Sequence, residues 1–195
     1  MKKLLVVLLW AAIVYGQNAG VSYLPAKQAV YYYKYADGST FESTMSITPA
    51  SEFKVTVLSQ DLYYEYRKNP GEVLGSASPV YLAEDSKGLY FKGEYGVKIP
   101  GIKYPVKKAA LWSYDYSETQ GSGAFATTEK HKTKFKIVAT DEEITTPAGV
   151  FKHVVIVNTG EVIFFYAPNV GLIRKDIDDK PFATLEKITV TYSTK

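Results

Sequence analysis

Cysteine is absent from this chain of 195 residues. A protein without cysteine cannot be held together by disulfides, so its stability has to come from a hydrophobic core. It also lacks the cysteine that receives the lipid anchor of a bacterial lipoprotein, and it has no thiolate nucleophile. After residue 16 no second long apolar run appears, whereas a helix needs about 20 apolar residues to cross a bilayer. We therefore expect no stable transmembrane segment in the rest of the chain.

Histidine and net charge are also low. The two histidines, His131 and His153, lie far apart in the sequence and cannot make a zinc site by themselves. No G-x-S-x-G motif is present. The formal net charge is +3, and Lys2 and Lys3 contribute two of these charges in the first sixteen residues. The rest of the chain is therefore near +1, which is too little positive charge to attract nucleic acid. We predict a non-enzymatic protein with no catalytic residues, no metal, no cofactor and no nucleic-acid partner.

Two acidic clusters leave alternatives open. The stretch from Asp176 to Asp179 has oxygens that could bind calcium, but a solvated charged turn is the interpretation we favour. The cluster Asp141-Glu142-Glu143 reads as a solvated segment leading into a turn. A carbohydrate-active enzyme is a third alternative, because only the distance between two carboxylates in space identifies such a site.

The first sixteen residues have the layout of a secretory signal peptide. Met1-Lys2-Lys3 is basic, residues 4–15 (LLVVLLWAAIVY) are apolar, and Gly16 is small. We expect cleavage after Gly16, with Ala19 as the second choice. This predicts an exported protein, periplasmic or extracellular, whose mature chain is residues 17–195.

Apolar and polar residues alternate with a period of two through most of the chain, and the seventeen tyrosines favour strands as well. We interpret the tyrosines as half-buried strand residues, with an aromatic surface for sugars or lipids as the alternative. Residues 132–137 alternate between lysines and less polar residues, which predicts a strand with one solvent-exposed face. Lysines on an edge strand hinder pairing with other chains, so we expect this strand to be an edge strand protected in that way. About ten short strands in one all-β domain follow, as an antiparallel sandwich or barrel. Four aromatic residues in these strands are expected to be buried: Trp112, Phe135, Phe151 and Phe165.

Two turns are indicated by the placement of proline, asparagine and glycine. Pro147 and Gly149 stand at the positions that proline and glycine prefer in a type I turn. Pro168 presets φ, Asn169 tolerates a positive φ, and Gly171 permits a close approach or a bulge. Both turns flank the most apolar strands, so we expect them to fix the register of hairpins.

These turns and their strands resemble a known family. The segments 146–157 (TPAGVFKHVVIV), 164–175 (FFYAPNVGLIRK) and 105–114 (PVKKAALWSY) resemble the exported bacterial TapB-like proteins of unknown function, although a glycine is expected where Ala109 or Ala110 stands. The resemblance covers about residues 105–177. It implies a curved antiparallel sheet akin to the half-barrel of periplasmic lipoprotein carriers, and it brings no catalytic residues. We therefore predict a curved antiparallel sheet or a partly open β-barrel.

A segment rich in glycine and proline, residues 96–105 (GVKIPGIKYP), is expected to be an ordered loop rather than a central strand. Lysines and apolar residues are mixed in and around it. We interpret it as a crossover loop with solvated lysines, with contact to anionic lipid headgroups or an acidic glycan as the functional alternative. We predict a binding or carrier protein for a hydrophobic or amphipathic ligand of the cell envelope. The alternative is a structural or adaptor protein that docks on a protein or glycan partner. The candidate ligand-binding residues are Tyr95, Lys98, Ile102, Lys103, Tyr104 and Lys107.

Overall fold

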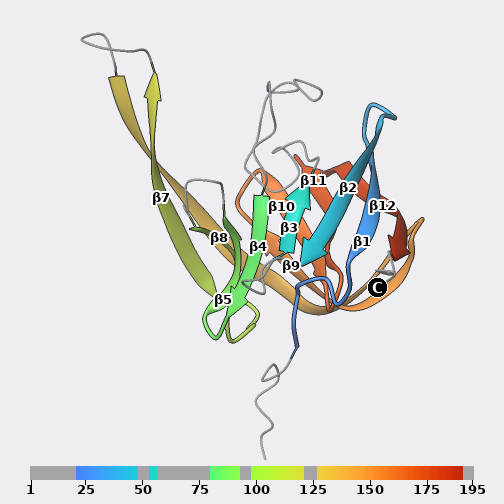
Figure 1. Cartoon of the computed structure of the whole chain (residues 1–195). Coiled ribbons are helices and arrows are strands. Elements are labelled where there is room, and N and C mark those ends of the chain that lie inside the picture. Colours follow the sequence, from blue (N-terminus) through green and yellow to red (C-terminus); the bar gives the residue numbers. More distant parts are fainter. Residues whose placement is uncertain (1–20, 48–52, 57–79, 93–97, 121–126, 191–195) are drawn as a thin grey trace, which may run out of the picture.

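A computed structural model describes residues 21–47, 53–56, 80–92, 98–120 and 127–190 (Figure 1). The predicted signal peptide, with its cleavage after Gly16 or Ala19, lies outside the described residues, and so does Tyr95. The described part contains strands and turns and no helix.

All the described strands belong to one antiparallel sheet with the order β6-β5-β4-β3-β2-β1-β12-β11-β10-β9-β8-β7. The sheet is curved, as Figure 1 shows, and it is not closed by pairing of its end strands. The prediction of an all-β protein with a curved antiparallel sheet is confirmed, with twelve described strands where about ten were expected. Their bounds are β1 Ala29–Tyr35, β2 Thr40–Ile47, β3 Phe53–Thr56, β4 Val80–Asp85, β5 Gly88–Lys92, β6 Lys98–Lys103, β7 Leu111–Gln120, β8 Thr127–Thr146, β9 Gly149–Asn158, β10 Val162–Ala167, β11 Gly171–Ile177 and β12 Lys180–Val190.

The chain follows the sheet as two meanders that meet in the middle. Strands β1 to β6 pair in sequence order, strands β7 to β12 do the same, and β1 pairs with β12 to join the two sets. As a result β6 and β7 are consecutive in the sequence but stand at opposite ends of the sheet. The curvature brings these two end strands into contact, and residues 104–110 connect them.

Tyrosines of β1 form part of the core, as the alternation predicts. Tyr31, Tyr33 and Tyr35 are buried, whereas Tyr32 and Lys34 between them face outward. The hydroxyl of Tyr33 donates to the main-chain oxygen of Leu172 at 2.7 Å, and that of Tyr31 donates to the oxygen of Val170 at 2.9 Å. A buried hydroxyl needs such an acceptor, because leaving it unpaired costs about 1–3 kcal/mol. These tyrosines are therefore structural.

The β10–β11 hairpin is buried on both faces. Phe164, Phe165 and Tyr166 are consecutive buried residues of β10, and most of β11 is buried as well. The turn between the strands contains Pro168 and Asn169, which has a φ of 60°, and β11 begins at Gly171, which has a φ of 91°.

A segment of residues 21–26, here called the strap, covers this turn. The amide of Ala26 donates to the oxygen of Asn169, and the amide of Asn169 donates to the oxygen of Ser22, both at 2.8 Å. The main-chain oxygen of Tyr23 stands 3.4 Å from the place that a side chain on Gly171 would occupy. The glycine therefore permits the close approach of the strap.

The predicted turn at Pro147 and Gly149 joins β8 to β9. Thr146 pairs with Gly149, so Pro147 and Ala148 form a two-residue loop, and Gly149 has a φ of 140°. The amide of Ala148 donates to the oxygen of Leu185 in β12 at 3.4 Å. The long strand β8 thus bends, through register shifts between residues 137 and 144, until its end reaches β12.

Three expectations about exposure and pairing were wrong. Residues 98–103 form strand β6 rather than a loop; Pro100 is tolerated because β6 is a terminal strand and its register with β5 shifts next to that residue. Trp112 and Phe151 are only half-buried, while Phe135 and Phe165 are buried, because Trp112 stands on a terminal strand and Phe151 lies near a hairpin end. The lysine-bearing strand β8 is not an edge strand, since β7 and β9 pair with it on both sides.

The predicted solvated turn from Asp176 to Asp179 is exposed at residues 178–179 but not at Asp176. Asp178 and Asp179 are exposed, with φ values of 50° and 60°, and they connect β11 to β12. Asp176 is buried rather than solvated, because its carboxylate accepts two hydrogen bonds of 2.6 Å from the guanidinium of Arg174. A buried carboxylate is stable when it is paired in this way.

Candidate ligand-binding seam

A hydrogen bond from the side chain of Trp112 joins the two end strands of the sheet. The indole Nε1 of Trp112, on β7, donates to the main-chain oxygen of Pro100, on β6, at 3.4 Å. The indole ring is stacked on Phe135 of the neighbouring strand, with 5.4 Å between ring centroids and 7° between the planes. The β7–β8 hairpin therefore fixes the ring of Trp112, and its nitrogen reaches across to β6. We call this junction the seam; it comprises Tyr90, Lys98, Ile99, Pro100, Trp112 and Tyr114.

Apolar side chains at the seam are only half covered by the rest of the protein. Ile99 on β6 and Trp112 and Tyr114 on β7 pack against the core but keep part of their surface in contact with solvent. Burial raises the pKa of Tyr114 above its ordinary value. The junction of the two end strands is thus a place where aromatic and aliphatic surface is accessible from outside.

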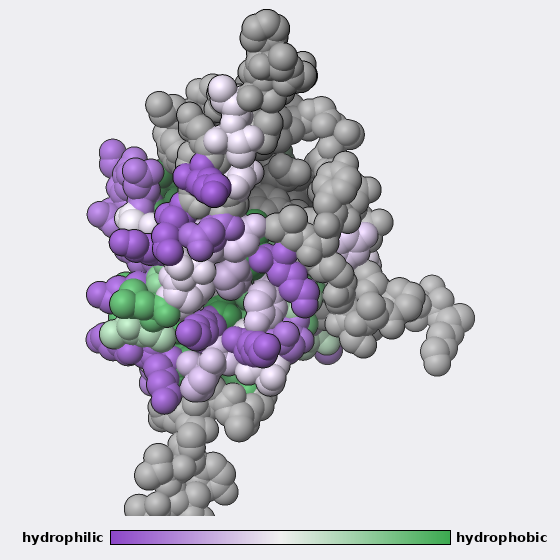
Figure 2. All heavy atoms as spheres, turned by 90° about the vertical axis from the view of Figure 1, so that its left-hand side faces the viewer, coloured by the Kyte–Doolittle hydropathy of each residue, from purple (hydrophilic) through white to green (hydrophobic). Residues whose placement is uncertain are grey.

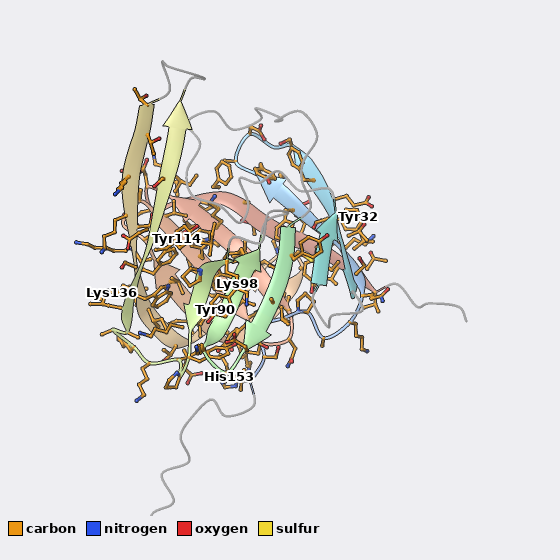
Figure 3. All side chains as sticks on the ribbon, turned by 60° about the vertical axis from the view of Figure 1, so that its left-hand side comes forward. Tyr32, Tyr90, Lys98, Tyr114, Lys136 and His153 are labelled. Carbon is orange, nitrogen blue, oxygen red and sulfur yellow. The ribbon has the colours of Figure 1, made fainter. Side chains whose placement is uncertain are left out.

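A lysine lies on the outer face of β6, the face opposite to that of Ile99, because side chains of a strand alternate. The ammonium of Lys98 stands over the ring of Tyr90, 5.4 Å from its centroid, which is a cation–π distance. Burial, and then the charge of Asp85, raise the pKa of Tyr90. Tyr90 pairs with Pro100 across β5 and β6, so this cation–π pair adjoins the point where Trp112 reaches β6. Figure 3 shows Tyr90, Lys98 and Tyr114 on the side of the molecule where these strands meet.

The other predicted ligand-binding residues are divided between surface and interior. Lys98, Lys103 and Lys107 are exposed. Ile102 has an exposed fraction of 0%, because it pairs with Leu89 on the inward face of β5–β6, so it cannot meet a ligand at the surface. Its role as a ligand-binding residue stays a prediction, but its strand position turns it inward, away from the exposed lysines around it.

Tyr104 is half-buried and serves a structural contact. Its hydroxyl donates to the carboxylate of Glu84, which also accepts from the hydroxyl of Ser22 at 2.6 Å and from the amide of Tyr23 at 2.9 Å. Burial, and then the hydrogen bond and charge of Glu84, raise the pKa of Tyr104 well above its ordinary value. Glu84 therefore ties the strap, β4 and the connection between β6 and β7 together.

Within the described residues, no three His, Cys, Asp or Glu side chains gather closely enough to hold a metal ion. Nδ1 of His153 lies 2.5 Å from the carboxylate of Asp141, but both side chains are more than 70% exposed (73% and 76%). His153 has a φ of 56°, which fits its position in the irregular part of the β8–β9 pairing. This pair therefore lies at the surface of the protein.

Comparison of the chain with protein families, curated proteins and solved structures finds no match. The resemblance to the TapB-like family therefore stays a prediction. No helix in the described part of the chain has the length and apolar character to span a bilayer.

Sequence reasoning missed Trp112 and Tyr90 as candidate site residues. Both look like ordinary strand aromatics, and no local signal distinguishes them. Their role depends on the contact between the two ends of the sheet, which requires knowledge of the whole strand order.

Proposed function

We propose that this protein is an exported, non-enzymatic carrier that binds an amphipathic molecule of the cell envelope at the seam. The observation that carries the proposal is the seam itself. Its two strands are the ends of a curved sheet and do not pair with each other, while half-buried apolar residues and an exposed lysine flank their contact. Ligand sites of this type combine an apolar surface with a few charged groups that orient the ligand.

The charges at the seam suggest an anionic head on the ligand. Lys98 and Lys103 are exposed on the same terminal strand, five residues apart. Ile99, Trp112 and Tyr114 would take the apolar part. An acyl chain entering here would meet the aromatic interior, in which Phe91 is stacked near Tyr166 at 6.3 Å between centroids.

Trp112 makes a direct test possible. The only other tryptophan, Trp10, lies in the predicted signal peptide, so processed exported protein should contain Trp112 alone. Lysophosphatidylglycerol, titrated below its critical micelle concentration, should change the Trp112 fluorescence saturably. The zwitterionic lysophosphatidylcholine should bind more weakly, because it lacks the net negative charge.

Matched charge variants distinguish binding at the seam from non-specific attraction to the net charge of the protein. Lys98→Glu with Lys103→Glu should weaken lysophosphatidylglycerol binding at least about tenfold, a loss of about 1.4 kcal/mol. Lys27→Glu with Lys180→Glu changes the net charge equally at exposed positions outside the seam and should bind as the wild type does. A fluorescence signal that never saturates, together with no lipid in native mass spectra of protein from its own host, would reject the carrier function.

A second candidate function rests on the outer edge of β7. No described strand pairs with the outer edge of this ten-residue strand. Such an edge presents main-chain donors and acceptors that can add a strand from a partner protein. This adaptor function predicts that Ser117→Pro, on the same strand beyond the seam residues Trp112 and Tyr114, abolishes capture of the partner and leaves lysophosphatidylglycerol binding unchanged.

A further inference from the structure

One face of the β7–β8 hairpin is cationic along its length. Four lysines of β8 alternate with its inward residues, and all are exposed: Lys130, Lys132, Lys134 and Lys136. They occupy one face over about 20 Å, given a rise of about 3.3 Å per residue. Among the described side chains of this face, Asp115 is the one acid, and it lies 3.5 Å from the ammonium of Lys132. We call this surface the lysine face.

The connection between β6 and β7 lies next to the end of the lysine row at Lys136. The amide of Ala109 donates to the oxygen of Ile137 at 2.7 Å, and the amide of Ile137 donates to the oxygen of Ala110 at 3.0 Å. This pairing holds the exposed residues Lys107 and Lys108 close to the end of the lysine row.

An exposed leucine lies among these lysines. Leu111 is 65% exposed and pairs with Lys136 across β7 and β8, so both side chains are on the same face. Figure 2 looks onto this side of the molecule and shows a small hydrophobic patch surrounded by hydrophilic residues. Figure 3 shows Lys136 on the outer side of β8. The surface thus combines several cations with one accessible aliphatic side chain.

We propose that the lysine face docks the protein on an anionic lipid bilayer. Lysines near such a surface are attracted to lipid phosphates, and their contributions add. Leu111 would enter the boundary between headgroups and acyl chains, as apolar residues of interfacial proteins do. A soluble linear polyanion would satisfy the lysines equally well but gives no role to an exposed leucine, which is why a bilayer is the better partner.

This docking is separate from ligand binding at the seam, although the two surfaces share β7. The seam residues Trp112 and Tyr114 point to the opposite face of β7 from Leu111, because side chains of a strand alternate. The two proposals can therefore fail independently, and each has its own variants.

Sedimentation with vesicles tests the proposal. Processed protein should bind vesicles of equimolar phosphatidylglycerol and phosphatidylcholine, and not vesicles of phosphatidylcholine alone. Lys134→Glu with Lys136→Glu should weaken this binding at least about tenfold, whereas Lys27→Glu with Lys180→Glu should weaken it less than about twofold. Added salt should weaken the wild type by screening.

A second pair of variants tests the leucine. Leu111→Asn should weaken vesicle binding about fivefold or more, and Val150→Asn, at a position that is 56% exposed on another hairpin, should leave it unchanged. The seam variant Lys98→Glu with Lys103→Glu should keep most of its vesicle binding. The proposal is overturned if the two lysine pairs have equal effects, or if the protein binds polyglutamate but not the anionic vesicles; the latter result would favour a polyanion as the partner.

Discussion

The β10–β11 and β7–β8 hairpins follow the same alternation of strand residues but have opposite surroundings. In β10–β11 the residues of both faces are largely buried, and the strap is hydrogen-bonded to the turn. In β7–β8 one face carries exposed lysines and the other is half covered, and the hairpin extends away from the body in Figure 1. The position of a hairpin in the strand order, more than its local sequence, decides how much of it is buried.

This difference assigns the two hairpins different tasks. The β10–β11 hairpin holds the aromatic stack of Phe164 and Tyr166 and accepts hydrogen bonds from the tyrosines of β1. The β7–β8 hairpin carries Trp112 and the lysine face, which are the surfaces proposed to bind. Stability should therefore be sensitive to β10–β11 and binding to β7–β8.

The largest expected contrast is in truncation of aromatic residues. Phe164→Ala should lower the free energy of unfolding by about 3–5 kcal/mol, because it empties a buried site. Trp112→Ala should cost only about 2 kcal/mol, because that side chain already contacts solvent. Urea unfolding measures both. Equal losses would show that the two hairpins contribute alike and would remove the basis of the comparison.

A smaller contrast is expected between two turn glycines. Gly171→Val should cost about 2–3 kcal/mol, since valine is strained at a φ of 91° and also meets the strap. Gly149→Val should cost about 1 kcal/mol: its φ of 140° is unfavourable, but no atom lies within 4 Å of the added Cβ. Thermal unfolding of the two variants gives the order, and a reversed order would argue against the strap as a fixed cover.

Alkaline pH should act on the region around the strap. Burial, and then Glu84, raise the pKa of Tyr23 to about 12, and burial raises that of Tyr31 still further. A raised pKa means that the folded state holds the proton more tightly, so this stability is present below pH 10 and is lost as the pH rises towards 12. The urea midpoint should therefore fall between pH 10 and 12, and Tyr23→Phe should make that fall less steep. An unchanged midpoint would mean that these hydroxyls are accessible to solvent.

The smallest contrast is between two adjacent tyrosines. Tyr33→Phe should cost about 1 kcal/mol, because the buried oxygen of Leu172 loses its donor. Tyr32→Phe should change stability by less than about 0.5 kcal/mol, since Tyr32 faces outward and keeps its ring beside Lys187. The two variants compared in one urea series check the inward and outward assignment of β1.

Local patterns predicted much of the fold and little of the site. The alternation at residues 132–137 predicted a strand with one solvent-exposed face, and the residue types around Pro147 and Pro168 predicted two hairpin turns. The structure has all three. The pairing of β1 with β12 joins residues far apart in the sequence, so no local pattern reports it. The exposure of Trp112 and the burial of Ile102 depend on that long-range order, which is why the seam could not be predicted.

Hydrogen exchange with and without lysophosphatidylglycerol is the most direct test of the central claim, that ligand binds at the seam while the β10–β11 hairpin stays fixed. The account predicts strong amide protection in β10 and β11 under both conditions, and a gain of protection confined to β6 and β7 when the lipid is present. Protection that appears in β10–β11 and not in β6 or β7, or no change anywhere at saturating lipid, would contradict it.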